Sequence, residues 1–128
     1  MSNEKVVQFD KMNIQQLEAA FQRLEREQTQ LLAKLSELQQ ESREHQLVID
    51  ACSKLSHSRK CFRLIGGVLV AQSTLEVKPA LESNKLNIDG FINKVDDSLK
   101  ERRNLLQNVQ TRIAKLQMRD VTPLIHPI

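Results

Sequence analysis

Hydrophobic residues recur at alternating intervals of three and four through the first half of the chain. This spacing places them on one stripe of a helix, and its persistence without Gly or Pro predicts a coiled-coil helix, not an ordinary surface helix. Gln, Glu, Arg, Lys and Ser dominate the positions between them. The stripe, here called the first seam, consists of Ile14, Leu17, Phe21, Leu24, Gln28, Leu31, Leu35, Leu38, Ser42, His45, Ile49 and Cys52.

A second heptad pattern fills the other half of the chain. Its seam consists of Leu81, Lys85, Ile88, Ile92, Val95, Leu99, Arg102, Leu106, Val109, Ile113 and Leu116. In an antiparallel pair of helices, the numbers of facing residues have a nearly constant sum, and the successive layers of the two seams sum alternately to 133 and 134. Each polar seam residue then meets an apolar one, so we expect the chain to fold back on itself as an intramolecular antiparallel coiled coil. Gln28, Ser42, Lys85 and Arg102 are expected to fix the register. His45 is either a neutral histidine in a half-exposed layer or a register or pH element.

Between the two heptads lie short β-rich runs that flank Gly66-Gly67. Because glycine tolerates the positive φ of tight hairpin turns, this predicts a β-hairpin. A two-residue turn pairs Leu64 with Leu69 and Phe62 with Ala71, which makes one face fully apolar; a three-residue turn with a bulge would change these pairs. The predicted order is an N-terminal tip at 1–12, a helix at 13–57, the hairpin at 58–73, a helix at 74–118 and an irregular tail at 119–128. Pro79 must lie near the start of the second helix or kink it, and Ser73 or Thr74 could cap an earlier start, so the first turn is left open.

This hairpin predicts an oligomer. An isolated two-stranded hairpin is marginal in water, its edges can pair, and a coiled coil that leads away from it cannot cover its apolar faces. We therefore expect several hairpins to join in a shared sheet or barrel. The expected assembly residues are Phe62, Leu64, Ile65, Gly66, Gly67, Val68, Leu69 and Val70. Nearby Arg59, Lys60 and Arg63 either dock an acidic partner or form a solvated flank.

Composition narrows the functional classes. The chain has 128 residues, 3% aromatic residues, three Gly and three Pro, which argues against a sandwich, a barrel or a many-looped enzyme. A net charge of +3 with almost no aromatic residues for base stacking does not point to nucleic acid. The longest uncharged stretch, Leu64 to Leu75, is too short to span a bilayer, and the first residues lack a signal-peptide pattern, so we expect a cytoplasmic protein without membrane contact.

No motif predicts catalysis, a cofactor or a metal. Cys52, His57 and Cys61, with His45, suggest a zinc site by residue type, but two of them follow a coil seam and one lies in a strand, so they do not converge. Asp50, Ser56 and His57 have the residue types of a hydrolytic triad, but no oxyanion donors or pocket accompany them.

The residues between the two seams resemble those of a known family. Cys61-Phe-Arg-Leu-Ile-Gly-Gly-Val-Leu-Val70, followed by Glu76-Val-Lys-Pro-Ala-Leu-Glu-Ser-Asn-Lys85, is similar to the hairpin and second-helix start of prefoldin subunits, in particular the eukaryotic subunit-2 branch. A single hairpin indicates the β class. The resemblance implies a mainly α fold, in which a long antiparallel two-helix coiled coil is joined by one β-hairpin. It also implies a heterohexamer of α-class and β-class subunits that captures unfolded actin and tubulin with its coiled-coil tips and delivers them to the cytosolic group II chaperonin without ATP.

In such a subunit the tips are the two chain ends, and apolar residues there have no evident partner within the chain. We expect exposed apolar groups flanked by charge to hold clients. The expected client-binding residues are Val6, Val7, Phe9, Met12, Ile14, Leu17, Leu116, Met118, Val121, Leu124 and Ile125. The Pro-containing tail is either a client contact or an unstructured end. The alternative function is a structural coiled-coil adaptor that dimerises through its hairpin.

Overall fold

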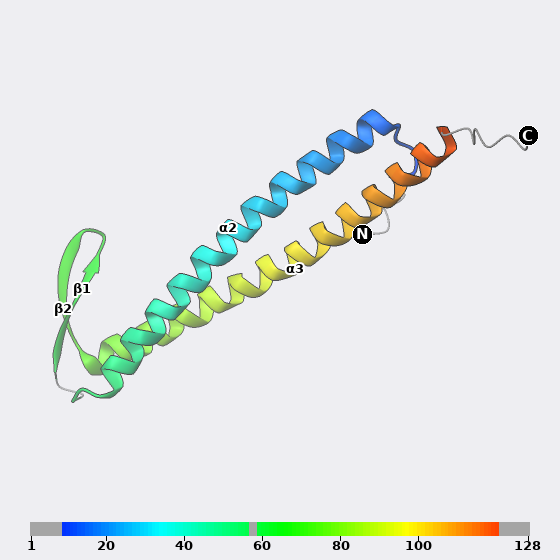
Figure 1. Ribbon diagram of the computed structural model, residues 1–128. Coiled ribbons are helices and arrows are strands. Elements are labelled where there is room, and N and C mark those ends of the chain that lie inside the picture. The colour runs from blue at the N-terminus through cyan, green and yellow to red at the C-terminus, as the bar shows by residue number, and fades with distance from the viewer. Residues whose placement is uncertain (1–8, 57–58, 121–128) are drawn as a thin grey trace, which may run out of the picture. The chain divides into compact units, whose positions relative to one another are not determined.

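The computed structural model describes residues 9–56 and 59–120 and consists of two long helices with a two-stranded hairpin between them in sequence (Figure 1). Helix α2 runs over Ile14–Ser53, strand β1 over Lys60–Ile65, strand β2 over Val68–Ser73 and helix α3 over Thr74–Asp120. This is the fold class that the heptads and the Gly-Gly turn predict. The chain divides into two compact units, one made of residues 1–33 and 96–128 and the other of residues 34–95.

Burial along both helices follows the two seams. Every seam residue is buried or half-buried, including the polar ones. Leu17, Leu24 and Val109 are the largest fully buried side chains, and all three are seam residues. Removal of this apolar stripe from water stabilises the paired helices, because each large aliphatic side chain contributes about 1.5–3 kcal/mol on full burial.

The helix that precedes the hairpin is shorter than its sequence suggests. Helix α2 ends at Ser53 instead of residue 57, and its last turn tightens through hydrogen bonds from Lys54 N to Ala51 O (3.2 Å) and from Leu55 N to Cys52 O (3.1 Å). Ser53 Oγ also donates to Ile49 O at 3.0 Å, a local bond that competes with helix continuation. The chain thereby turns toward β1.

Helix α3 is longer than expected at its C-terminal end. It begins at Thr74, in agreement with a cap before Pro79, and continues to Asp120, two residues beyond the predicted end at 118. The apolar stripe stops earlier than the helix does, and no Gly or Pro lies between Leu116 and Asp120 to end it. Pro79 is accommodated within the first two turns.

Helix α2 begins with two reciprocal hydrogen bonds. Asn13 Oδ1 accepts from Gln16 N at 2.8 Å, and Gln16 Oε1 accepts from Asn13 N at 3.0 Å. This is a capping box, which satisfies two backbone donors that the first turn leaves free. Met12, just before the cap, packs on the cluster that contains Leu17, four residues after the cap, in the arrangement of a hydrophobic staple.

Candidate functional site

The hairpin has the register that a two-residue turn demands. Leu64 pairs with Leu69 and Phe62 with Ala71, and no bulge intervenes. Gly66 and Gly67 adopt φ values of 56° and 82°, the left-handed conformation that a tight primed turn requires. The prediction of the turn and of its pairs is therefore confirmed.

One face of the hairpin is apolar and open to solvent. Phe62, Leu64 and Leu69 are 66%, 72% and 64% exposed, and Ala71 beside them is exposed too. Since successive residues of a strand point to opposite faces, these four side chains share one side of the hairpin. No element of residues 34–56 or 59–95 covers this face, although its residue types are those of a core.

The opposite face is partly covered and more polar. Ile65 and Val68 lie next to the turn and are 47% and 63% exposed, whereas Val70 is half-buried. Arg63 Nη1 donates to Gln72 Oε1 across the strands at 3.5 Å. The two faces of the hairpin are therefore not equivalent as contact surfaces.

Thr74 fixes the base of the hairpin to the start of α3. Its N–H and its Oγ1 both donate to Arg59 O, at 2.9 and 3.0 Å, and Cys61 Sγ lies 3.6 Å from the same hydroxyl. Thr74 is only 2% exposed. These contacts hold the first residues of β1 against the first turn of α3, although the sequence suggested only a helix cap for Thr74.

The second candidate site is made by residues 9–24 and 105–118. Phe9, Leu17, Ala20, Leu24, Leu105, Leu106 and Val109 make one buried cluster, and Met12, Phe21, Ile113 and Leu116 pack against it. Phe9 is only 4% exposed. The expectation that Phe9 and Met12 lack a partner within the chain is therefore wrong, because both pack on the helices.

The remaining residues expected to bind clients differ in accessibility. Leu17 is fully buried, Ile14 and Leu116 are half-buried, and Met118 is 76% exposed. Ile14 and Leu116 line a shallow hollow together with Asn13 and Gln15. The other expected residues, Val6, Val7, Val121, Leu124 and Ile125, lie outside the described residues.

Sequence reasoning missed Ala20 and Leu105, which are buried although they lie beside the seams and not on them. Leu105 directly precedes the seam residue Leu106, so two consecutive apolar residues were the available signal that this side of α3 is covered. In an antiparallel pair both residues occupy the same flank, one position before a seam residue of their own helix.

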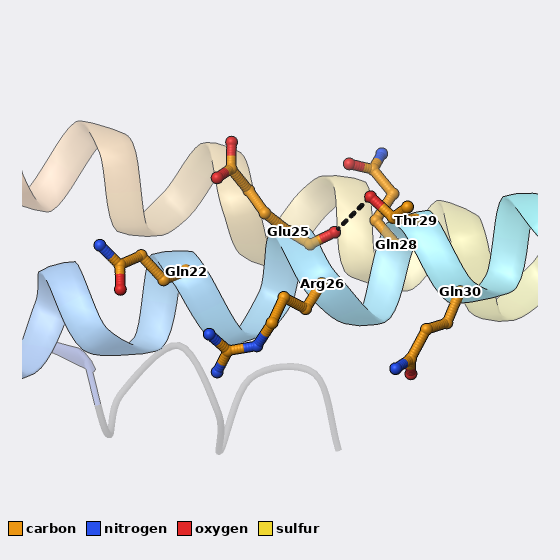
Figure 2. Close-up of a pocket in the computed structure, with 6 residues that line it drawn as sticks. All are labelled: Gln22, Glu25, Arg26, Gln28, Thr29 and Gln30. Atoms are coloured by element: carbon orange, nitrogen blue, oxygen red, sulfur yellow. Dashed lines mark hydrogen bonds between the residues drawn. The ribbon is translucent and has the colours of Figure 1, made fainter.

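The described residues show no convergent chemical site. A shallow surface hollow is lined by Gln22, Glu25, Arg26, Gln28, Thr29 and Gln30, all from successive turns of α2. Figure 2 shows that the Arg26 and Gln30 side chains point to one side of the helix and the Glu25 carboxylate to the other, while Thr29 Oγ1 bonds Glu25 O at 3.0 Å. Within 9–56 and 59–120, no three His, Cys, Asp or Glu side chains are arranged to hold a metal ion; His57 lies outside these ranges. No helix of the described residues is long and apolar enough to cross a membrane.

Comparison with known proteins identifies the family. The prefoldin subunit family model matches residues 15–120. The chain belongs to the prefoldin subunit family. Human and bovine prefoldin subunit 2 are 43% identical to this prefoldin subunit over 88 residues, which are 69% of this chain and 57% of those proteins. The matched stretch thus spans little more than half the length of these relatives.

Other relatives agree with this assignment. Prefoldin subunit 2 of Arabidopsis thaliana is 36% identical over 86 residues, 67% of this chain and 58% of the plant protein. The crystal structure of the prefoldin beta subunit from Thermococcus strain KS-1 matches with a TM-score of 0.69, covers 86% of this chain and 94% of that one, and is 14% identical. At that identity the likeness concerns the fold, and it confirms the single-hairpin architecture of this prefoldin subunit.

Proposed function

We propose that this chain is one subunit of a heterohexameric prefoldin, a co-chaperone that acts in the cytoplasm without ATP. In this proposal it assembles with other α-class and β-class prefoldin subunits, captures unfolded proteins such as actin and tubulin, and delivers them to the group II chaperonin. The observation that carries the proposal is the hairpin with an open apolar face in a chain of the prefoldin family.

The hairpin supplies the assembly surface. In the lone chain the side chains of Phe62, Leu64 and Leu69 stay in contact with water, so the favourable free energy of burying them is not gained. A hairpin of two strands also leaves both of its edges unpaired. Hairpins of neighbouring subunits would satisfy both needs at once, by strand pairing at the edges and by packing on the apolar face. The same surface also fits the alternative function, an adaptor that dimerises through its hairpin.

Native mass spectrometry of the tagged chain, purified gently from its own cytosol, separates these functions. We expect one copy of the chain in an assembly of about six different coiled-coil subunits. A homodimer would contradict the prefoldin proposal and favour the adaptor, since an isologous interface closes on two copies. A stable lone monomer would contradict both.

Client capture is proposed for the exposed apolar groups near residues 9–24 and 105–118. Met118 is the most exposed large apolar side chain of the described residues, and its flexible thioether suits varied contacts. Several weak contacts of this kind, one set per subunit, would add through effective concentration. Affinity for unfolded chains would thus require no deep pocket.

Substitution of Met118→Glu in the assembled complex tests this role. We expect weaker suppression of the aggregation of a denatured client, measured by light scattering. The control is Leu47→Glu, which charges an apolar side chain of α2 that is 69% exposed and belongs to neither candidate site. Equal suppression by the two variants would remove Met118 from the client surface.

A further inference from the structure

The heptad pattern of the coiled coil does not explain why Phe9 is buried. Phe9 is 4% exposed, yet it precedes α2 and belongs to neither seam. It shares a buried cluster with Ala20 and Leu105, the two residues on the flank of the helix pair. Arg112 lies on the same flank, one position before the seam residue Ile113, and it contacts Asp10. Residues 9–10 therefore cover one side groove of the helix pair, which we call the flank groove and define by Ala20, Leu105 and Arg112.

The flank groove is built to receive a large side chain. Ala20 contributes little volume where the heptad pattern tolerates larger residues, and Leu105 offers an aliphatic wall that is only 3% exposed. Beneath them lie the fully buried seam residues Leu17 and Val109. Without Phe9 more of this apolar surface would face water, because among the described residues outside the two helices only Met12 also packs against the cluster.

Apart from the burial of the Phe9 ring itself, the attachment of this segment to the groove is light. Met12 N donates to Phe9 O at 3.1 Å, which closes a turn within the segment itself. The polar contacts to α3 come from Arg112, whose Nη2 donates to Asp10 O at 3.1 Å and whose Nε lies 3.9 Å from Asp10 Oδ1. The Asp10 side chain is 63% exposed and the Arg112 side chain 22%, and an ion pair with one solvated partner and a long distance holds weakly.

Residues 9 and 10 can move about a fixed point, which is the start of α2. The capping box at Asn13 and Gln16 anchors the start of α2 whether or not Phe9 is seated, because both of its bonds lie on the helix side of Met12. Phe9 and Asp10 can therefore leave the flank groove without unwinding α2.

We propose that Phe9 is an internal stand-in for a client and that the flank groove is a client-binding site for one aromatic or large aliphatic side chain of an unfolded polypeptide. This inference rests on the proposed function and specifies how that site is regulated. A client side chain enters when Phe9 leaves. The apparent association constant is therefore the intrinsic one multiplied by the fraction of chains in which Phe9 has left the groove. Clients that present many apolar side chains at high local concentration displace Phe9, and native surfaces do not.

The absence of Trp from the sequence allows a direct test. A Phe9→Trp chain carries 5-fluorotryptophan at a single position, and it is assembled with its unlabelled partner subunits. Reduced, carboxymethylated α-lactalbumin, a permanently unfolded polypeptide, is added, and the ¹⁹F resonance is recorded together with the fluorescence anisotropy of the dye-labelled client. We expect the resonance to move from its buried position toward that of the urea-unfolded chain in proportion to client bound.

A pair of matched variants tests the competition itself. Asp10→Arg repels Arg112 and loosens the segment without touching the apolar cluster. We expect it to lower the client Kd by about 3- to 10-fold, which is the ratio of the open fraction of the groove in the variant to that in the parent. Glu18→Arg makes the same change of charge at an exposed position of α2, and we expect a Kd within 2-fold of the parent.

Each outcome decides the inference. Client binding with an unmoved ¹⁹F resonance, a weaker Kd for Asp10→Arg, or equal tightening by Asp10→Arg and Glu18→Arg would each overturn the stand-in role and leave the proposed function intact. A resonance that moves with the concentration of the assembly in the absence of client would assign the groove to a second copy of the chain. No client binding by the parent assembly would overturn the proposed function together with the inference.

Discussion

At the scale of the residue, Asp89 shows how polar groups are used within the coil. Ser42 Oγ donates to Asp89 Oδ1 at 2.6 Å across the two helices, and Lys85 Nζ lies 2.9 Å from Asp89 Oδ2. The hydrogen bond from Ser42 first, and then the one from Lys85, hold the pKa of the Asp89 carboxyl below its usual value of 3.8, although burial opposes them. Two polar seam residues thus obtain a charged partner beside the seam, which couples the register of α2 to that of α3 within residues 34–95.

Replacement of Asp89 should therefore have a pH-dependent effect. A carboxylate with a lowered pKa stabilises the folded chain above its unfolded pKa, and that contribution is lost as pH falls through the folded pKa. We expect Asp89→Asn to lower the free energy of unfolding by about 0.5–1 kcal/mol at pH 7, a modest value because the side chain is 39% exposed. Urea unfolding followed by circular dichroism at pH 7 and at pH 2.5 measures the difference, which should be smaller at the lower pH.

The matched control is Asp96→Asn, which removes the same charge from a carboxylate that is 51% exposed and contacts Lys100 within one helix. We expect a smaller effect there, since an exposed pair four residues apart contributes about 0.3–0.5 kcal/mol. Equal effects of the two substitutions at pH 7 would mean that the contact between helices adds nothing to stability.

At the scale of the element, the hairpin depends on its turn. Gly66 and Gly67 both have positive φ, and no atom lies within 4 Å of where a Cβ would be added at either position. Any cost of a side chain at these positions is therefore conformational and not steric. Gly90, by contrast, lies within α3, where a Cβ would also meet open space.

Alanine at these glycines should accordingly have opposite effects. We expect Gly66→Ala to weaken the hairpin by about 1–2 kcal/mol, the cost of a left-handed alanine, and Gly66→Asn to restore most of the loss, because asparagine visits that conformation readily. Gly90→Ala should stabilise α3 by about 0.8–1 kcal/mol. Amide hydrogen exchange over residues 60–73 reports the first two variants and thermal unfolding reports the third. Unchanged exchange in Gly66→Ala would show that the hairpin does not need this turn.

The elements also show what the heptads could predict and what they could not. The alternating intervals of three and four between apolar residues predicted the buried and half-buried stripe of each helix. Gly66-Gly67 predicted the register of the hairpin. Both were predictable because both signals are local. Burial of Phe9 depends on packing between segments about a hundred residues apart, which leaves no periodic trace. The end of α2 at Ser53 was missed because no Gly or Pro follows Cys52 to mark the end of the helix.

At the scale of the whole molecule, the distribution of exposed apolar side chains is uneven. Within residues 9–56 and 59–120, half of the exposed large apolar residues fall within the fourteen positions from Phe62 to Leu75: they are Phe62, Leu64, Ile65, Val68, Leu69 and Leu75. Those on the helices, such as Leu47 and Leu86, are scattered among charged and amide residues. Isolated exposed leucines are ordinary on protein surfaces, whereas an apolar strand pair with open edges indicates association.

A single charge on the hairpin should therefore prevent assembly without unfolding the chain. Leu64 is 72% exposed in the single subunit, so Leu64→Lys removes no contact within it, but a lysine buried between hairpins would lack a partner. We expect unchanged helical circular dichroism and loss of the chain from the mixed assembly, measured by native mass spectrometry after mixing with its partner subunits. Leu47→Lys, an equal change at a side chain 69% exposed on α2, should assemble normally. Retention of the Leu64→Lys chain in the complex would exclude this face of the hairpin from the interface and leave the strand edges as the surface that joins the subunits.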